Sequence, residues 1–225
     1  MSRSSLLTDK MNRTLLFLSV AILVAACSPD QSSPVAGPES EKPAQDAPTA
    51  LLPDSGAEIA SEESTRAKAA IGAFASALQA ELKNAMQEGG PVNAIAVCNA
   101  TAMPITAKVS LEQDLVLSRV SLKNRNPANA PNDWQRDILE SFEDRKTAGE
   151  ELTSLAWSEV AATEGKQQFR FMQAIPTGPL CLQCHGSDIS PEVSARLAEL
   201  YPGDKATGYA EGEIRGAFVL TRDLP

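Results

Sequence analysis

The sequence is poor in histidine, cysteine and basic residues, and each shortage excludes a class of site. Its 225 residues include one histidine, His185, and four cysteines, so a metal site built from several histidines is excluded. Asp and Glu (29) outnumber Lys and Arg (20), which gives a formal net charge of −9. This charge argues against nucleic acid as a partner and against a basic domain that binds a membrane surface.

Long apolar runs are also scarce. The run at residues 15–26 is too short to span a bilayer comfortably, follows three basic residues and has the length expected of a signal peptide. It ends in the letters LVAAC, which resemble the lipobox of bacterial lipoproteins. We therefore expect lipidation of Cys27 after cleavage, with an ordinary cleaved signal as the alternative. Because Ser28 rather than Asp follows, we expect a periplasmic protein that is lipid-anchored at the outer membrane.

Composition divides the chain into three parts. These are a signal peptide (1–26), a tether (27–60) and one folded domain (61–225). Residues 28–60 hold six prolines and almost no bulky apolar residue. Such a segment cannot bury enough surface to offset its chain entropy, so we expect it to be extended and disordered. The remaining domain is long enough for one hydrophobic core.

Hydrophobic periodicity and turn residues predict the elements of this domain. The predicted helices are 62–88, which stops at Gly89-Gly90-Pro91, a second from Val92 to Pro104, a third N-capped by Asn132, and a short fourth that starts at Ser190-Pro191. The predicted strands are 114–122, 155–162, 166–175 and 212–223, the last with the alternation of a half-buried strand. This order is not regular βαβ winding and contains no internal repeat. It indicates an α+β domain, an antiparallel sheet with helices on one side.

The motif Cys181-x-x-Cys184-His185 carries the chemistry. In an exported chain this spacing is typical of covalent attachment of c-type haem, with two thioether bonds and the adjacent imidazole as an iron ligand. Three other interpretations are weaker. Structural zinc needs two further Cys or His ligands and only Cys98 remains. A thioredoxin-like CxxC needs a neighbouring βαβ unit. A plain disulfide between Cys181 and Cys184 is the third.

The second axial ligand is left open by the residues alone. With Cys27 spent on lipid and Cys181 and Cys184 on haem, Cys98 is unpaired, and an unpaired thiol in an oxidising compartment is a liability unless it is buried or used. Cys98 is therefore the first candidate and Met103 the second. The remaining alternatives are a methionine at 86 or 172, a lysine, water or an open position, and Cys98 could equally be a small buried hydrophobe.

Three separated motifs resemble the Tll0287-like haem-domain family. They are RVSLKNRNPANAPNDW (119–134), IPTGPLCLQCHG (175–186) and YPGDKATGYAEGEIRGAFVL (201–220), and the likeness extends over most of residues 64–223. The resemblance implies a PAS-like fold, a central antiparallel sheet flanked by helices, with one covalent c-type haem. It also implies that His185 and Cys98 are the axial ligands of the iron.

Two further side chains are weaker candidates for haem contacts. Arg125, in the proline-rich loop 123–131, is a candidate partner of a haem propionate. Tyr209 is either a haem contact or a loop anchor, and Trp134 is more simply explained as core.

Taken together, the motifs predict a membrane-tethered periplasmic c-type haem protein that acts in redox sensing or one-electron transfer with a redox or signalling protein as partner. We expect it not to be an enzyme. The alternatives are a haem enzyme with peroxidase-like or nitrogen-oxide chemistry, which would need an open distal site, and a non-haem protein with a CxxC disulfide.

Overall fold

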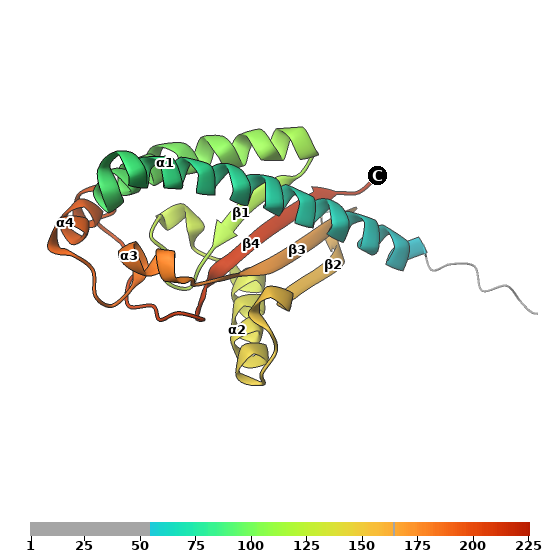
Figure 1. Cartoon of the computed structure of the whole chain (residues 1–225). Helices are drawn as coiled ribbons and strands as arrows, with labels where there is room; N and C mark the ends of the chain where they lie inside the picture. The colour runs from blue at the N-terminus through green and yellow to red at the C-terminus, as the bar shows by residue number, and fades with distance from the viewer. Residues whose placement is uncertain (1–54, 164) are drawn as a thin grey trace, which may run out of the picture. The chain divides into compact units, whose positions relative to one another are not determined.

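A computed structural model describes residues 55–163 and 165–225. The predicted signal peptide, the expected lipidation site Cys27 and the predicted tether up to residue 54 lie outside the described residues. The described part contains a four-stranded sheet of β1 (Val116–Val120), β2 (Ala156–Thr163), β3 (Lys166–Pro176) and β4 (Ile214–Asp223). All three strand pairs are antiparallel, in the order β1-β4-β3-β2. The predicted α+β class is confirmed (Figure 1).

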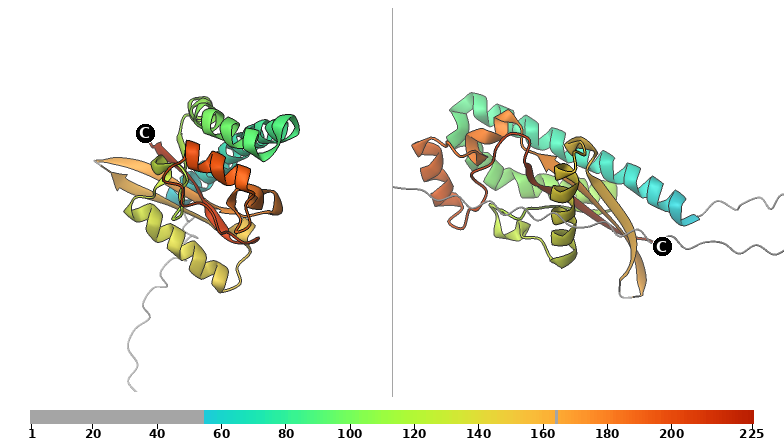
Figure 2. Two further views of the ribbon diagram at one scale, coloured as in Figure 1. Left: turned by 90° about the vertical axis from the view of Figure 1, so that its left-hand side faces the viewer. Right: turned by 90° about the horizontal axis from the view of Figure 1, so that it is seen from below.

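The helices are α1 (Ser55–Gln113), α2 (Asp133–Thr147), the four-residue α3 (Leu182–His185) and α4 (Pro191–Leu200). Asn132 caps α2 and Ser190 caps α4, as the sequence predicted. The structure adds that the side chain of Gln135 accepts from the Asn132 amide, which completes a capping box. Figure 2 shows α1 and α2 on opposite faces of the sheet. The expectation of helices on one side only is therefore wrong.

α1 consists of two helical arms joined by a sharp break. Gly89 and Gly90 have non-helical backbone angles there, and Gly90 has a φ of +67°, which glycine adopts without steric cost. The side-chain amide of Asn93 donates to the Ala85 carbonyl across the break, at 3.1 Å. Figure 1 shows the second arm folded back along the first, and the break lies at the glycine pair where the sequence predicted it.

Two details of α1 differ from the prediction. The first arm begins at Ser55, so residues 55–60 are helical rather than part of an extended tether. The second arm does not end at Pro104 but continues to Gln113. Pro104 is exposed, and one turn later Val109 is 4% exposed in the core. Burial of this last part of the arm on the sheet outweighs the one backbone hydrogen bond that proline removes.

The sheet is buried on both faces. On the α1 side, Phe74 and Ile71 pack against Leu117, Phe171 and other strand residues. On the α2 side, Leu139 and Phe142 pack against another set of strand residues, Met172 and Val219 among them. Because β4 lies between β1 and β3, consecutive residues such as Val219 (1% exposed) and Leu220 (2%) are both buried. The prediction of a half-buried last strand is therefore wrong.

A third, smaller cluster lies at the end of the domain near the α1 break. Its buried members are Ile95 of α1 and Val193 and Leu197 of α4, with Cys184 and Tyr201 packed partly against them. This cluster joins the second arm of α1 to the part of the chain that carries the CxxCH motif. The fold thereby brings Cys98 and His185, which are far apart in the sequence, to one end of the molecule.

Candidate functional site

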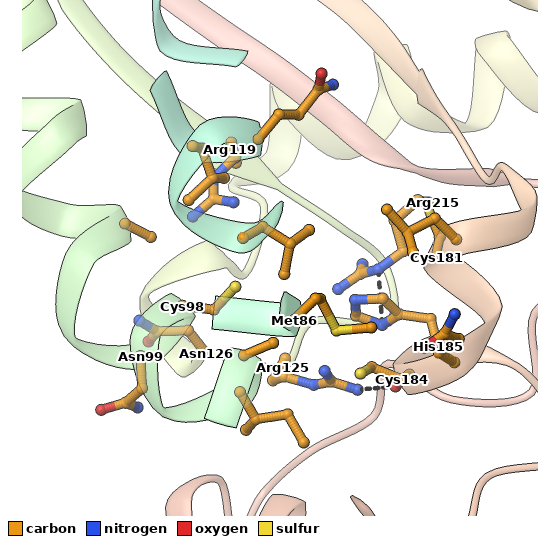
Figure 3. Close-up of a pocket in the computed structure, with 18 of the residues that line it drawn as sticks. Met86, Cys98, Asn99, Arg119, Arg125, Asn126, Cys181, Cys184, His185 and Arg215 are labelled. Carbon is orange, nitrogen blue, oxygen red and sulfur yellow. Dashed lines mark hydrogen bonds between the residues drawn. The ribbon is translucent and has the colours of Figure 1, made fainter. Parts of the chain in front are cut away.

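A cavity of about 810 Å³ lies between the two arms of α1, the inner end of β1 and the CxxCH segment. This volume is within the range of roughly 300–1,000 Å³ that cofactor and ligand sites occupy. Leu78, Leu82, Ala94 and Ile95 give its α1 wall an apolar surface. Figure 3 shows Cys98 on one side of the cavity and His185, with Cys184, on the other.

The structure brings together the residues singled out from the sequence. Cys98, Arg125, Cys181, Cys184 and His185 all line this cavity. The three cysteines are free thiols. The thiol of Cys98 therefore faces the same space as the CxxCH motif, although more than eighty residues separate them in the chain.

The methionines divide into two groups. Met86 and Met103, two of the alternatives considered for the second axial ligand, line the cavity. Met172 is fully buried in the core on the α2 side of the sheet. Of the three methionine alternatives for an iron ligand, two thus have access to the cavity and Met172 does not.

The CxxCH motif lies on two short consecutive helical turns. A 3₁₀ turn, Pro179–Cys181, leads into α3, and the amide of Gly186 donates to the Leu182 carbonyl at 2.9 Å to end it. Three residues make roughly one helical turn, so Cys181 and Cys184 lie on the same side of the segment. A Cβ on Gly186 would lie 2.6 Å from the Leu182 carbonyl oxygen, which explains the glycine after His185.

His185 is oriented through one of its ring nitrogens. Its Nδ1 lies 2.7 Å from the Ala206 carbonyl oxygen and 3.2 Å from Nε of Arg215. Nδ1 cannot donate to the carbonyl and accept from the guanidinium at once. The shorter contact favours Nδ1–H donating to Ala206, which leaves Nε2 with a free lone pair. A histidine that ligates a metal is commonly held by such a bond from its other nitrogen.

The charge state of His185 agrees with this orientation. Burial, followed by the nearby charges of Arg215 and Arg125, lowers the pKa of His185 from 6.5 to about 3. The imidazole is therefore neutral at physiological pH, as an iron ligand must be.

Arg125 fastens the segments around His185. Its Nε donates to Asp204 Oδ2 at 3.0 Å, and its Nη2 donates to the carbonyls of Cys184 and Ala206. Asp204 in turn accepts from the Ala206 amide at 2.7 Å. The side chain predicted to meet a propionate thus lines the cavity but is already paired with Asp204.

Tyr209 supports His185 from behind. The rings of Tyr209 and His185 are perpendicular, with centroids 6.3 Å apart, and the Tyr209 hydroxyl lies 3.4 Å from Ser121 Oγ. Tyr209 is 6% exposed and is not among the described residues that line the cavity. Its position is that of a loop anchor, the second of the two roles considered for it.

The charged side chains of the cavity are all basic. Lys83, Arg119, Arg125 and Arg215 line it, and none of its described lining residues is Asp or Glu. Burial raises the pKa of the Cys98 thiol, and the positive charges of Arg119 and Arg125 act in the opposite direction. The cavity therefore favours anionic groups inside a protein that is acidic overall.

Three residues of the site were not predicted from the sequence: Arg119, Arg215 and Asp204. Arg119 interrupts the apolar strand LVLSRVSL, and this isolated cation is the signal that could have identified it. Arg215 gives a weaker signal of the same kind in β4. Nothing near Asp204 in the sequence distinguishes it from other loop carboxylates.

The donor set fits a haem better than a bare metal ion. No group of three or more His, Cys, Asp or Glu side chains within residues 55–163 and 165–225 is placed to hold an ion. Haem iron needs at most two protein ligands, since the macrocycle supplies the other four. A large cavity with apolar walls, two thiols on one segment, a neutral imidazole beside them and a facing thiol meets that requirement.

Comparisons with known proteins agree with this fit. The sequence matches the Tll0287-like family over residues 56–222. No functionally curated protein matches it. Among solved structures, that of the cyanobacterial heme-protein Tll0287 is similar, with a TM-score of 0.54 and 22% sequence identity over 73% of this chain and 96% of that chain. At this level of identity the structural likeness shows a common fold.

Proposed function

This chain belongs to the Tll0287-like family, and from that premise we propose that it is a periplasmic c-type haem protein, tethered to the membrane by lipid, that acts in one-electron transfer or redox sensing. Cys181 and Cys184 would hold the haem by thioether bonds. Nε2 of His185 and Sγ of Cys98 would ligate its iron. Bound haem would supply a centre that changes between the ferric and ferrous states.

A single observation carries the proposal: the cavity that contains the CxxCH motif also contains Cys98. The segment bearing His185 is fixed by the bonds of Arg125 and Ala206, so the imidazole is positioned in advance. Thiolate ligation stabilises the ferric state, so we expect a low reduction potential.

The cavity favours electron transfer or sensing over catalysis. An enzyme of the peroxidase class needs an acid–base group beside an open iron position. Among the described lining residues there is no carboxylate, and His185 is the only histidine of the sequence. By contrast, Met103 and Leu180 line the cavity and are 54% and 53% exposed. Such apolar side chains at the edge of a haem suit transient contact with a redox or signalling partner.

Absorption spectra of the ferric and ferrous protein, matured in a host with c-haem assembly machinery, test the proposal. We expect covalent haem in the wild type and a changed ferric spectrum in Cys98→Ala. The matched controls are Met86→Ala and Met103→Ala, which also alter the cavity wall and should leave the spectrum unchanged. Absence of covalent haem would refute the haem assignment. A spectrum altered by Met103→Ala and not by Cys98→Ala would assign the ligand to Met103.

The membrane tether requires a separate test. In cell fractionation, we expect the wild-type chain in the outer-membrane fraction and Cys27→Ser among soluble periplasmic proteins. Ser28→Asp should retain the lipid but remain at the inner membrane. A wild-type chain recovered in the soluble fraction would contradict lipidation and leave the ordinary signal peptide.

A further inference from the structure

The three arginines that line the cavity differ in whether their side chains have a hydrogen-bond partner among the described residues. Arg125 is paired with Asp204 and two backbone carbonyls. Arg215 donates to Ser121 Oγ at 3.1 Å and lies over the ring of Tyr209. For Arg119, no hydrogen bond or ion pair to its side chain occurs within the part of the chain that the structure describes. A cation in a largely apolar cavity requires an anionic partner, because burial without one is costly.

The side chain of Arg119 is held in place by aromatic packing. Arg119 lies on β1 opposite Phe218 of β4, and its guanidinium carbon lies 5.0 Å from the ring centroid of Phe74. Phe74 is 1% exposed and contacts Phe218 edge-on, with centroids 5.9 Å apart. A guanidinium over an aromatic ring is attracted by the ring's negative face, and this contact uses none of its N–H donors in a hydrogen bond.

Arg119 and the cysteines of the CxxCH motif lie in different parts of the cavity wall. Arg119 extends from β1 into the cavity, whereas the thiols of the motif belong to the CxxCH segment, and Figure 3 shows Arg119 away from Cys184. A haem carries its vinyl groups, which form the thioethers, at one edge and its two propionates at the opposite edge. A group that receives a propionate must therefore lie away from the attachment site.

We propose that Arg119 binds a propionate carboxylate of the haem, an inference that rests on the proposed function. Guanidinium and carboxylate form a bidentate, charge-assisted pair. Cys181 and Cys184 would then hold one edge of the haem and Arg119 the other, in the cavity that Cys98 and His185 also line. This assigns to Arg119 the role that the sequence suggested for Arg125.

A binding comparison in the full chain tests the assignment. The double variant Cys181→Ala/Cys184→Ala, which cannot form thioethers, is titrated with haem and with haem dimethyl ester, whose carboxylates are blocked. Adding Arg119→Met should weaken haem binding about tenfold, as expected for loss of one charge-assisted pair, and change binding of the diester less than about twofold. Arg119→Lys should restore part of the loss. The matched control is Arg196→Met on the surface of α4, which should affect neither ligand.

If Arg119→Met weakens the binding of haem and of its dimethyl ester equally, the proposal is overturned, and Arg119 acts through Cys98 or through the fold. Haem binding that Arg119→Met leaves unchanged overturns the proposal as well. The proposed function itself is refuted if the double variant Cys181→Ala/Cys184→Ala binds neither haem nor its diester and the wild type also lacks covalent haem.

In the matured holoprotein, resonance Raman spectroscopy gives an independent readout. Arg119→Met should shift the propionate bending band at unchanged haem content, and an unshifted band contradicts the assignment.

Discussion

At the scale of single residues, the pair of Arg125 and Asp204 has the clearest energetic consequence. Their side chains are 12% and 11% exposed, and they connect the loop after β1 to the CxxCH segment. Asp204→Asn leaves Arg125 buried without a countercharge, so we expect a loss of about 3 kcal/mol in the free energy of unfolding. Denaturant titration of the wild type and of Asp204→Asn measures this loss. The exposed pair Arg196–Glu199 is the matched control, and Glu199→Gln should cost less than about 1 kcal/mol. Equal losses would contradict a buried role for the Arg125–Asp204 pair.

His185 predicts a pH dependence of the haem-free protein. Its pKa is lowered from 6.5 to about 3 in the folded state, mainly by burial and then by Arg215 and Arg125. The unfolded chain therefore binds a proton that the folded chain rejects. The associated stability is fully present above about pH 6.5 and is lost as the pH falls toward about 3.

Unfolding by denaturant at about pH 7 and about pH 5 checks this expectation. The wild type should lose roughly 1–2 kcal/mol more than His185→Gln between the two values, because the variant lacks the titrating group. Carboxylates titrate in both proteins and cancel in the comparison. If the wild type and His185→Gln lose the same free energy of unfolding between the two pH values, His185 is accessible to protons in the folded state.

At the scale of elements, the break in α1 controls the shape of the cavity, because both arms form its wall. Gly90 has a φ of +67°, and a Cβ at this position would have no neighbouring atom within 4 Å, so Gly90→Ala is opposed by backbone conformation alone. We expect it to destabilise the fold by about 1–2 kcal/mol. Gly72 also has open space but lies in regular helix, so Gly72→Ala should stabilise by about 0.5–1 kcal/mol. Chemical denaturation of both variants measures the change in the free energy of unfolding. A change of the same sign in Gly90→Ala and Gly72→Ala would contradict a backbone break fixed at Gly90.

The elements also show how far the sequence predicts this structure. Local signals predicted three features correctly: the break at the glycine pair in α1, the Asn132 cap of α2 and the Ser190 cap of α4. They failed at Pro104, where packing of the following turn on the sheet outweighs a local break. They also failed for β4, since the central position of a strand depends on pairing with segments distant in the sequence.

The candidate site divides in the same way. The CxxCH motif is recognisable because its chemistry requires a fixed local spacing. Arg119 is not, because its role depends on the ring of Phe74 from another element and on the lack of a carboxylate among the described residues that line the cavity. Asp204 is recognisable only once Arg125 is seen beside it.

At the scale of the whole domain, the hydrophobic interior is unevenly distributed. Two large clusters cover the faces of the sheet, whereas the end that carries the cavity has only the small cluster around Ile95, Val193 and Leu197 among the described residues. The CxxCH segment is held by the contact of Cys184 with this small cluster and by hydrogen bonds, such as that of His185 to Ala206 and that of Arg125 to the Cys184 carbonyl. Stability is therefore expected to differ between the two ends, as it commonly does within a domain.

This unevenness predicts where haem stabilises the fold. Hydrogen exchange is compared between the full chain matured with haem and the same chain produced without it. We expect haem to slow exchange strongly in residues 78–103 and 180–201, which surround the cavity and the small cluster. Exchange in α2 and β3 should change little, because their core is complete without the cofactor. Uniform protection of all segments would instead mean that the domain folds only around its haem, and that the two sheet-facing clusters are insufficient to hold it.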